Sequence, residues 1–230
     1  MAYIMLKNIH KTYGSKKNRT PVLNGLEMEI ERGEMVAVMG KSGCGKSTLL
    51  NIMGGLDWAD SGEYEVDSVS ISGLKGDSLA KFRKKNIGFV VQNFALIDDM
   101  SVYKNIALPL RYHGKTQENI RETVKQLMLE LEIAGKEGEL TRDLSGGKRQ
   151  RVAIARAIAC EPNIILADEP TGALDEKTSD EILKIFHRLN QKGKTIIIVT
   201  HEKSVACQCN KIYYMADGKI DGEPEVITEE

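Results

Sequence analysis

The chain has 230 residues, of which 41% are hydrophobic and 28% are charged, and its formal net charge is only −1. This length predicts one large domain or a core with a small subdomain, and the balanced charge gives no electrostatic reason to expect nucleic acid as a partner. The first residues lack the pattern of a signal peptide, and no apolar run approaches the roughly 18 residues of a membrane helix. We therefore expect any work at a membrane to go through a partner.

The first part of the chain predicts strands, interrupted by a glycine-rich loop and a helix. Residues 3–9 and 23–30 alternate between apolar and polar side chains, as strands do. An apolar run at 36–39 predicts a buried strand that leads into the loop and then a helix. Short strands over 64–71, a helix over 78–85 and a buried strand over 87–91 are expected next.

Helical spacing replaces the strand pattern from about residue 98 to residue 158. Ser101 is the expected N-cap of a helix that Pro109 ends, and Thr116 is the expected N-cap of the next helix. A third helix is expected over 146–159. This pattern predicts a helical subdomain of about 98–158, inserted into an α/β core that consists of residues 1–97 and 159–220.

The core pattern resumes after the helical segment. The continuous apolar run at 164–167 is typical of a central parallel strand, and a helix over 175–190 and a buried strand over 195–200 follow. Asp217-Gly218 predicts a hairpin between two short strands. The acidic tail, residues 221–230, is expected to be frayed.

A phosphate-binding loop is predicted between the strand at 36–39 and the following helix, because the sequence there matches G-x-x-x-x-G-K-[ST]. Glycines let backbone N–H groups surround a phosphate at the positive end of a new helix. Lys46 would reach the β- and γ-phosphates, and the Ser47 hydroxyl would reach Mg²⁺. The alternative is a chance glycine loop before a helix. The expected nucleotide-binding residues are Gly40, Lys41, Ser42, Gly43, Cys44, Gly45, Lys46, Ser47 and Thr48.

Two carboxylates, Asp168 and Glu169, follow the apolar run at 164–167. Ligands of open α/β sheets bind at the carboxyl ends of the strands. Asp168 suits the acid that holds the magnesium shell, and Glu169 suits a base that deprotonates the attacking water. The alternative is a pair of exposed acids in a turn.

Ser145-Gly146-Gly147 opens the third helix and offers a second position for a phosphate, with free N–H groups and a hydroxyl. One chain has no need of two such positions for one triphosphate. Two chains that face each other, each completing the other's site, would use both. The motif alone is weak, and its place shortly before the acidic strand strengthens it.

These motifs, in this order, resemble the nucleotide-binding subunit of ATP-binding cassette (ABC) transporters over nearly the whole chain. Tyr13 matches the aromatic residue that stacks on adenine, Gln92 matches the Q-loop and His201 the switch histidine. Ala173-Leu174-Asp175 matches the D-loop. The resemblance implies an α/β P-loop NTPase with an N-terminal antiparallel β-subdomain and an inserted helical subdomain.

The resemblance also implies roles for single residues. Glu169 is the expected base, His201 contacts the γ-phosphate, and Lys46 holds the phosphates. Tyr13 and His201 each keep a simpler alternative, in which Tyr13 only packs on the edge strand and His201 only ends an apolar strand. The expected catalytic residues are Glu169, His201, Gln92 and Lys46, and the expected magnesium residues are Ser47, Gln92 and Asp168.

Residues 145–147 are expected to cap the γ-phosphate of the opposite subunit in an ATP-bound homodimer, with Asp175 at the dimer seam. The departure from the family pattern is Lys148, where the family usually has glutamine. Hydrolysis is expected to survive this change, while the extra charge alters affinity or dimer closure.

Residues 168–175 and Gly54-Gly55-Leu56-Asp57 resemble the subfamily of MacB, LolD and Bce-type exporters, whose ATPase pairs with a separate permease. The resemblance implies a cytoplasmic ATPase on the inner face of the membrane, with the permease docked near residues 92–110. The apolar residues that we expect at this contact are Phe94, Leu96, Ile97 and Met100. The alternative is that they form part of the interior of the helical subdomain. A rival function is an ABC ATPase of the cell-division type, which regulates a membrane complex without transport.

Overall fold

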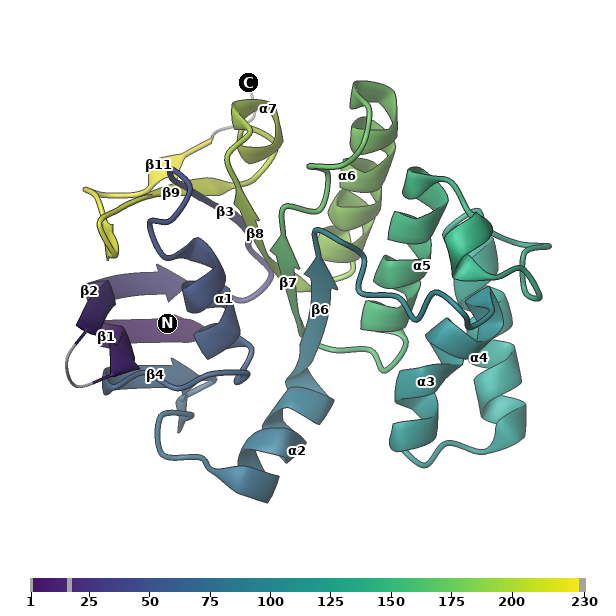
Figure 1. Ribbon diagram of the computed structural model, residues 1–230, viewed down its shortest axis with the longest axis horizontal. Helices are drawn as coiled ribbons and strands as arrows, with labels where there is room; N and C mark the ends of the chain where they lie inside the picture. The colour runs from purple at the N-terminus through teal and green to yellow at the C-terminus, as the bar shows by residue number, and fades with distance from the viewer. Residues whose placement is uncertain (1, 16–17, 228–230) are drawn as a thin grey trace.

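The computed structural model describes residues 2–15 and 18–227, which form two sheets with helices around them (Figure 1). One sheet is antiparallel, with the strand order β2-β1-β4-β5. Its strands are β1 (Ile4–Ser15), β2 (Asn18–Ile30), β4 (Ser61–Val66) and β5 (Val69–Ser70). The strand β1 is longer than predicted, because its pairing with β2 continues through two irregular positions as far as Ser15.

The second sheet has the order β10-β9-β3-β8-β7-β6, with β11 paired to β9. Its strands β9, β3, β8, β7 and β6 are parallel to one another. The strands are β3 (Met35–Met39), β6 (Ile87–Val91), β7 (Ile164–Asp168), β8 (Thr195–Thr200), β9 (Lys211–Ala216), β10 (Lys219–Ile220) and β11 (Glu225–Val226).

The helices are α1 (Lys46–Met53), α2 (Gly76–Asn86), α3 (Val102–Tyr112), α4 (Gln117–Glu130), α5 (Gly146–Ile158), α6 (Glu176–Gln191) and α7 (Lys203–Ala206). In Figure 1, α3, α4 and α5 lie together at the end of the molecule opposite the antiparallel sheet. Within the described ranges, every helix is too short or too polar to cross a membrane.

The apolar runs of the parallel strands are explained by burial on both faces of the sheet. In β8, Ile196 and Ile198 belong to a core shared with α3–α6, while Ile197 and Val199 belong to a core shared with α1 and the antiparallel sheet. Successive side chains of a strand point to opposite faces, so a strand with two covered faces has no polar alternation.

The prediction that Pro109 ends its helix is wrong, because α3 continues to Tyr112. Proline removes one helical N–H donor, but Leu110 just beyond it is only 2% exposed and belongs to the apolar core. Burial of this side chain favours one further turn. The backbone oxygen of Pro109 still accepts a hydrogen bond from the N–H of His113.

The acidic tail is also more ordered than predicted, as far as it is described. Glu225 pairs with Ile212 in the β11–β9 ladder, and the Tyr214 hydroxyl donates to the Glu225 carboxylate over 2.7 Å. These bonds hold the segment that we expected to be frayed. Residues 228–230 of that prediction lie outside the described residues.

The register of the parallel strands brings four predicted motifs to one edge of the sheet. Met39 is paired with Thr200, Asp168 with Val199, and Val91 with Asp168. The next residue of each strand therefore continues into the phosphate loop, His201, Glu169 or Gln92. Segments that are far apart in the sequence meet here because the strands all end at the same level.

Candidate active site

The loop between β3 and α1 has a backbone that its glycines make possible. Gly43 and Gly45 have φ angles of 82° and 108°, in the left-handed region that favours glycine. A Cβ atom at Gly40 would lie 2.3 Å from the backbone oxygen of Met215. Lys46 is 7% exposed, and its Nζ donates to the backbone oxygens of Gly40, over 2.7 Å, and Lys41, over 3.1 Å. The loop thus curls around an ammonium group.

A cavity of about 660 Å³ lies beside this loop and gathers most of the predicted catalytic side chains. Val22 enters it from β2, and the other lining residues all come from the predicted motifs. They are Ser42, Gly43, Gly45, Lys46, Ser47, Thr48, Gln92, Asp168, Glu169 and His201. The structure therefore brings together the phosphate loop, both acids, the glutamine and the histidine.

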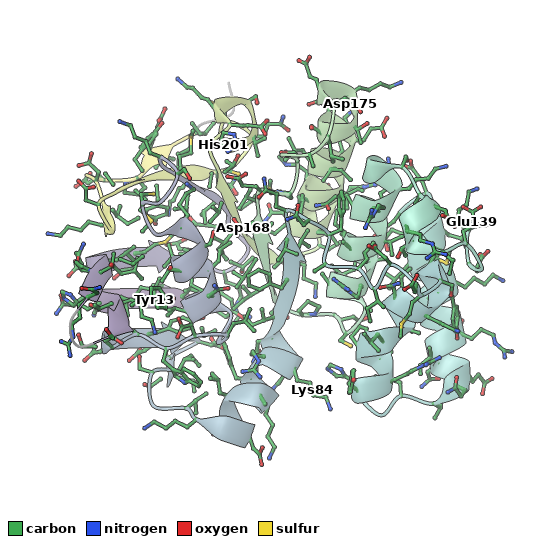
Figure 2. The ribbon with its side chains drawn as sticks, viewed as in Figure 1. Tyr13, Lys84, Glu139, Asp168, Asp175 and His201 are labelled. Carbon is green, nitrogen blue, oxygen red and sulfur yellow. The ribbon has the colours of Figure 1, made fainter. Side chains whose placement is uncertain are left out.

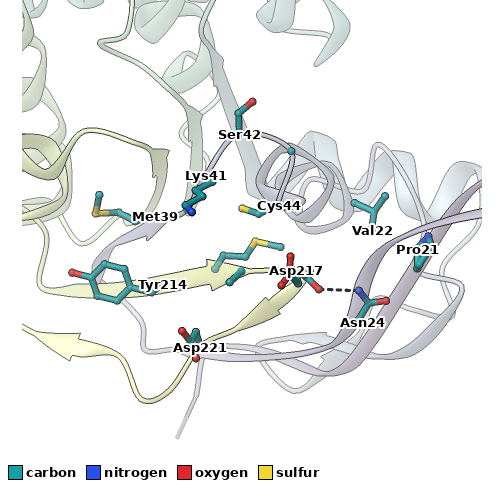
Figure 3. A pocket seen from close by; sticks show the side chains of 15 residues that line it. Pro21, Val22, Asn24, Met39, Lys41, Ser42, Cys44, Tyr214, Asp217 and Asp221 are labelled. Atoms are coloured by element: carbon teal, nitrogen blue, oxygen red, sulfur yellow. Dashed lines mark hydrogen bonds between the residues drawn. The ribbon is translucent and has the colours of Figure 1, made fainter.

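The other predicted loop residues face a second cavity of about 620 Å³ (Figure 3). Gly40, Lys41 and Cys44 line it, together with residues of the hairpin between β9 and β10. Within that hairpin, the backbone oxygen of Asp217 accepts a hydrogen bond from the Asn24 side chain over 2.8 Å. Residues of the loop thus line both cavities, whereas Asp168 and Glu169 line only the 660 Å³ cavity.

Asp168 lines the 660 Å³ cavity together with Lys46 and Ser47 of the loop. Burial raises the pKa of Asp168, while a hydrogen bond from the Ser47 hydroxyl lowers it and the charge of Glu169 raises it further. A carboxylate, a hydroxyl and the amide oxygen of Gln92 are the hard oxygen donors that Mg²⁺ prefers. The side chains of this edge therefore fit a magnesium ion.

Glu169 is held from two sides. Its Oε2 accepts a hydrogen bond from Nε2 of Gln92 over 2.9 Å, and its Oε1 lies 2.9 Å from Nδ1 of His201. Its φ angle is 44°, which is an uncommon conformation for a residue with a side chain. A Cβ atom at Gly172 would lie 3.3 Å from both the Gln92 amide and the Glu169 carboxylate. The carboxylate is therefore fixed closely between an amide and an imidazole.

Tyr13 lies in β1 and is 40% exposed, and it is not among the described residues that line the 660 Å³ cavity. Its hydroxyl donates to Asp57 over 2.5 Å, and Lys11 binds the same carboxylate over 2.7 Å. The Lys11 ammonium also lies 5.0 Å from the centre of the Tyr13 ring. The sequence did not predict this group, because the predicted strand ended at residue 9, whereas Lys11 and Tyr13 lie two apart on the longer β1.

Ser145, Gly146 and Gly147 stand at the start of α5 and do not line the 660 Å³ cavity in the described chain. A Cβ atom at Gly147 would lie 2.5 Å from Cγ2 of Thr178. Thr178 in turn donates from its backbone N–H and its hydroxyl to Asp175, the N-cap of α6. Figure 2 shows Asp175 at this end of α6, and Asp168 at the central sheet. Gly147 thus faces α6 of its own chain, and Gly146 faces Leu174 just before that helix.

The sequence model of the ABC transporter family matches residues 23–172. The chain belongs to the ABC transporter family. It is therefore an ATPase subunit of that family, and this confirms the class of protein and of enzyme that the sequence predicts.

Among curated ABC proteins, the chain is 45% identical to the uncharacterized ATP-binding protein YknY of Bacillus subtilis, covering 94% of both chains. It is 41% identical to the bacitracin export ATP-binding protein BceA of Halalkalibacterium halodurans, covering 96% of this chain and 87% of BceA. It is 40% identical to the macrolide export ATP-binding/permease protein MacB of Neisseria meningitidis over 96% of this chain. It spans only 34% of MacB, which is a longer protein. These relatives confirm the predicted subfamily.

Among solved ABC structures, the fold matches the ATP-binding cassette MJ0796 in a dimeric post-hydrolysis state with ADP and Pi. The TM-score is 0.91 at 39% sequence identity, and the match covers 98% of this chain and 99% of that chain. A second dimeric structure of MJ0796, described as a bacterial ABC transporter cassette, gives the same TM-score at 40% identity. The predicted fold class is confirmed.

Proposed function

We propose that this ATPase hydrolyses ATP in the 660 Å³ cavity, with Glu169 as the base that activates water. The observation that carries this assignment is the carboxylate of Glu169, which is held between Gln92 and His201 at the edge where the phosphate loop ends. A general base must be placed within hydrogen-bond reach of its proton. The two contacts and the uncommon backbone of Glu169 supply this placement before the substrate arrives.

The phosphate loop has a separate role in this proposal. Its N–H groups and the Lys46 ammonium bind the phosphates of ATP, and His201 stabilises the charge of the leaving γ-phosphate. Tyr13 stacks on the adenine from its place in β1, beside the first residues of α1. Within this group, Lys46 must exchange its contacts with the Gly40 and Lys41 oxygens for the phosphates.

Mg²⁺ is the second component that the proposal requires. Ser47 and Gln92 would hold the ion directly, and Asp168 would act through its hydration shell. The bound ion would neutralise part of the phosphate charge. The support for this assignment is the set of oxygen donors around the half-buried Asp168.

ATP binding is proposed to join two copies of the chain head to tail. Residues 145–147 of one copy would then complete the site of the other, with Asp175 at the seam. Two observations support this arrangement: the similar cassette MJ0796 is dimeric, and residues 145–147 of this chain do not line its own cavity within the described residues.

The work of the ATPase is proposed to be done on a separate membrane permease, as part of an exporter. BceA and MacB are named as export proteins, and MacB contains a permease in the same chain. We place the permease contact near residues 92–110 because Ile97, five residues after Gln92 in the sequence, is an exposed apolar side chain. The ATPase would then lie on the cytoplasmic face of the membrane through this partner alone.

The test of the proposed chemistry is Glu169→Gln. The amide is isosteric but cannot accept the proton, so we expect ATP turnover to fall by about 10²–10⁴-fold, the range for loss of a general base. ATP binding should remain, as measured with a fluorescent nucleotide. Static light scattering should show the variant as a dimer with ATP and as a monomer without it.

The matched control is Glu202→Gln, because Glu202 lies after the neighbouring parallel strand β8 but does not line the cavity within the described chain. This control should keep the turnover of the unmodified protein. Near-normal turnover of Glu169→Gln would remove Glu169 from its role. A monomer at high protein and ATP concentrations would contradict the dimer.

A further inference from the structure

The segment that follows Gln92 has an unfavourable backbone. Phe94 and Ala95 have φ angles of 60° and 46°, so two successive residues with side chains adopt the left-handed region. Such conformations persist only where the surrounding structure holds them. Within the segment itself, the N–H of Phe94 donates to the oxygen of Val91 over 2.9 Å. The N–H of Ala95 likewise donates to the oxygen of Asn93 over 2.6 Å. Further support comes from another element, α5.

Arg156, in the last turn of α5, binds this segment with both arms of its guanidinium. One terminal nitrogen donates to the backbone oxygen of Ala95 over 2.7 Å, and the other donates to that of Phe94 over 3.0 Å. The fork is planar and rigid, so two bonds fix the orientation of the two peptide groups as well as their position. Burial lowers the pKa of Arg156, which agrees with a cation enclosed by backbone.

Arg149 holds the same segment at a second point. It lies seven residues before Arg156, which puts both side chains on one face of the helix. Its guanidinium lies 5.1 Å from the centre of the Phe94 ring, and one of its nitrogens donates to Asp98 over 2.5 Å. This face of α5 therefore holds the segment at residues 94, 95 and 98. Asn105 of α3 holds it at Ile97, whose N–H and oxygen it binds over 2.9 and 3.1 Å.

The other end of the segment enters the catalytic site. Gln92 precedes Phe94 by only two residues, and its amide donates to the Glu169 carboxylate over 2.9 Å. A shift of the Phe94 and Ala95 peptides would therefore move the Gln92 side chain relative to Glu169. Arg156 is 13 residues before Glu169 in the sequence, and among the described residues the side-chain partners of the Glu169 carboxylate are Gln92 and His201 instead.

We propose that Arg156 is a positioning residue for Gln92. Its guanidinium holds the left-handed turn at Phe94 and Ala95, and this turn presents the Gln92 amide to Glu169 and to the magnesium ion. The proposal rests on the function proposed above, in which Gln92 and Glu169 take part in ATP hydrolysis. It assigns a role to the C-terminal end of α5, whereas residues 145–147 stand at the start of that helix.

The experiment compares Arg156→Gln and Arg156→Lys with the control Arg151→Gln in the full-length protein. Arg151 is also a poorly exposed arginine of α5, but it binds Glu132 and Glu181 instead of the segment after Gln92. Hydrogen exchange of the Phe94 and Ala95 amides is measured without nucleotide. We expect exchange at least about 10-fold faster in Arg156→Gln, an intermediate rate in Arg156→Lys, and an unchanged rate in Arg151→Gln.

Turnover is then measured as a function of Mg²⁺ and ATP concentration. Loss of a residue that orients a ligand typically costs about 10–100-fold in metal affinity or activity. We expect Arg156→Gln to lower kcat and to raise the Mg²⁺ concentration for half-maximal turnover by about 10-fold, with little change in KM for ATP. Arg156→Lys keeps the charge but can satisfy the fork only in part, so its effect should be smaller.

A double-mutant cycle with Gln92→Ala tests the path. If Arg156 acts through Gln92, then Arg156→Gln adds no further loss of turnover in the Gln92→Ala background. Additive losses, or unchanged amide exchange at residues 94–95, would overturn the proposal. If Arg156→Gln does not fold, the same cycle is run with Arg156→Lys.

The cycle also separates this proposal from the proposed function. If Gln92→Ala alone keeps full turnover, the role of Gln92 in hydrolysis is wrong and Arg156 cannot act through it. Amide exchange would still show whether Arg156 holds the segment. If Gln92→Ala lowers turnover while Arg156→Gln changes neither exchange nor turnover, only the positioning role is overturned.

Discussion

At the scale of one residue, the partly buried carboxylate of Asp168 lowers the free energy of unfolding when it is ionised. Burial at the end of β7 raises the pKa of Asp168, so the folded chain holds this proton more tightly than the unfolded chain does. Protonated Asp168 makes its whole contribution to stability at low pH, and this contribution is lost as the pH rises through the raised pKa. At neutral pH the ionised carboxylate therefore destabilises the nucleotide-free protein.

This argument predicts that Asp168→Asn stabilises the nucleotide-free protein at pH 7 and abolishes most of its turnover. The gain in melting temperature should grow with pH and vanish below the pKa of Asp in the unfolded chain. For a chain of this size, about 1 kcal/mol corresponds to about 2–4 °C. Differential scanning calorimetry from pH 4 to pH 8 measures the effect. A lower melting temperature at every pH would show that hydrogen bonding to Ser47 outweighs burial.

Asp57 fixes Tyr13, and this contact predicts a selective effect on nucleotide binding. Burial alone would raise the pKa of Asp57, but hydrogen bonds from Lys11, Tyr13 and the Trp58 N–H lower it. Asp57→Asn removes the charge that holds Lys11 beneath the tyrosine ring. We expect the Kd for ATP to rise by about 5-fold, the value of one hydrogen bond of about 1 kcal/mol, as measured by fluorescence titration.

Two comparisons decide whether this effect acts through the adenine. Tyr13→Phe keeps the ring but loses the bond to Asp57, so it should weaken ATP binding to a similar extent. Inorganic triphosphate, which has no base, should bind the protein and the Asp57→Asn variant equally well. An equal loss for inorganic triphosphate would place the effect in the phosphate loop instead of the base site.

At the scale of elements, the start of α5 packs directly on the start of α6. The Gly147 backbone leaves no room for a Cβ atom, because Cγ2 of Thr178 would lie 2.5 Å away. Gly147→Ala should therefore destabilise the protein by about 1–3 kcal/mol, the usual cost of overpacking. Chemical denaturation measures this free energy.

Thr178→Ser provides the matched variant, because it removes Cγ2 and keeps the hydroxyl that donates to Asp175. The double variant Gly147→Ala with Thr178→Ser should regain most of the lost stability. If turnover returns as well, Gly147 serves only to pack the two helices. If stability returns and turnover does not, Gly147 acts on the nucleotide as proposed. Failure to regain stability would contradict the packing argument.

The elements that the sequence predicted well depend on local chemistry. Ser101 and Thr116 cap their helices, as expected, by accepting hydrogen bonds from N–H groups three residues further on. The predictions for the end of α3 and for the acidic tail were wrong, because both features depend on partners elsewhere in the sequence. The contacts of Arg156 were invisible for the same reason, since its acceptors are backbone oxygens 61 and 62 residues away.

At the scale of the whole molecule, parallel strands assemble a site from motifs that lie as far apart as Ser42 and His201. The motifs predicted the chemistry, the sheet and a place for residues 145–147 in the site of an opposite subunit, but not that the phosphate loop lines two cavities. The structure separates them into one group that lines the 660 Å³ cavity and another, residues 145–147, at the start of α5. This separation is what a site shared between two copies requires.

A mixing experiment tests that requirement. Lys46→Ala disables the phosphate loop, and Ser145→Arg blocks the partner's site with a bulky charge, so each variant alone should be inactive. A mixed dimer contains one site with both parts intact: the loop of the Ser145→Arg copy and the helix start of the Lys46→Ala copy. In an equal mixture about half of the dimers are mixed, and each mixed dimer has one complete site where the unmodified dimer has two. Turnover should therefore recover to about a quarter of the unmodified value.

The recovery should depend on protein concentration in the same way as dimer formation. The control mixes the double variant, Lys46→Ala with Ser145→Arg in one chain, with the single variant Lys46→Ala, and this mixture should show no recovery. In that mixture, only the Lys46→Ala copy has an intact helix start, and the copy facing it has lost its phosphate loop. Every pairing therefore lacks a complete site. No recovery in the first mixture, with both variants shown to be folded and to exchange subunits, would mean that residues 145–147 act within their own chain.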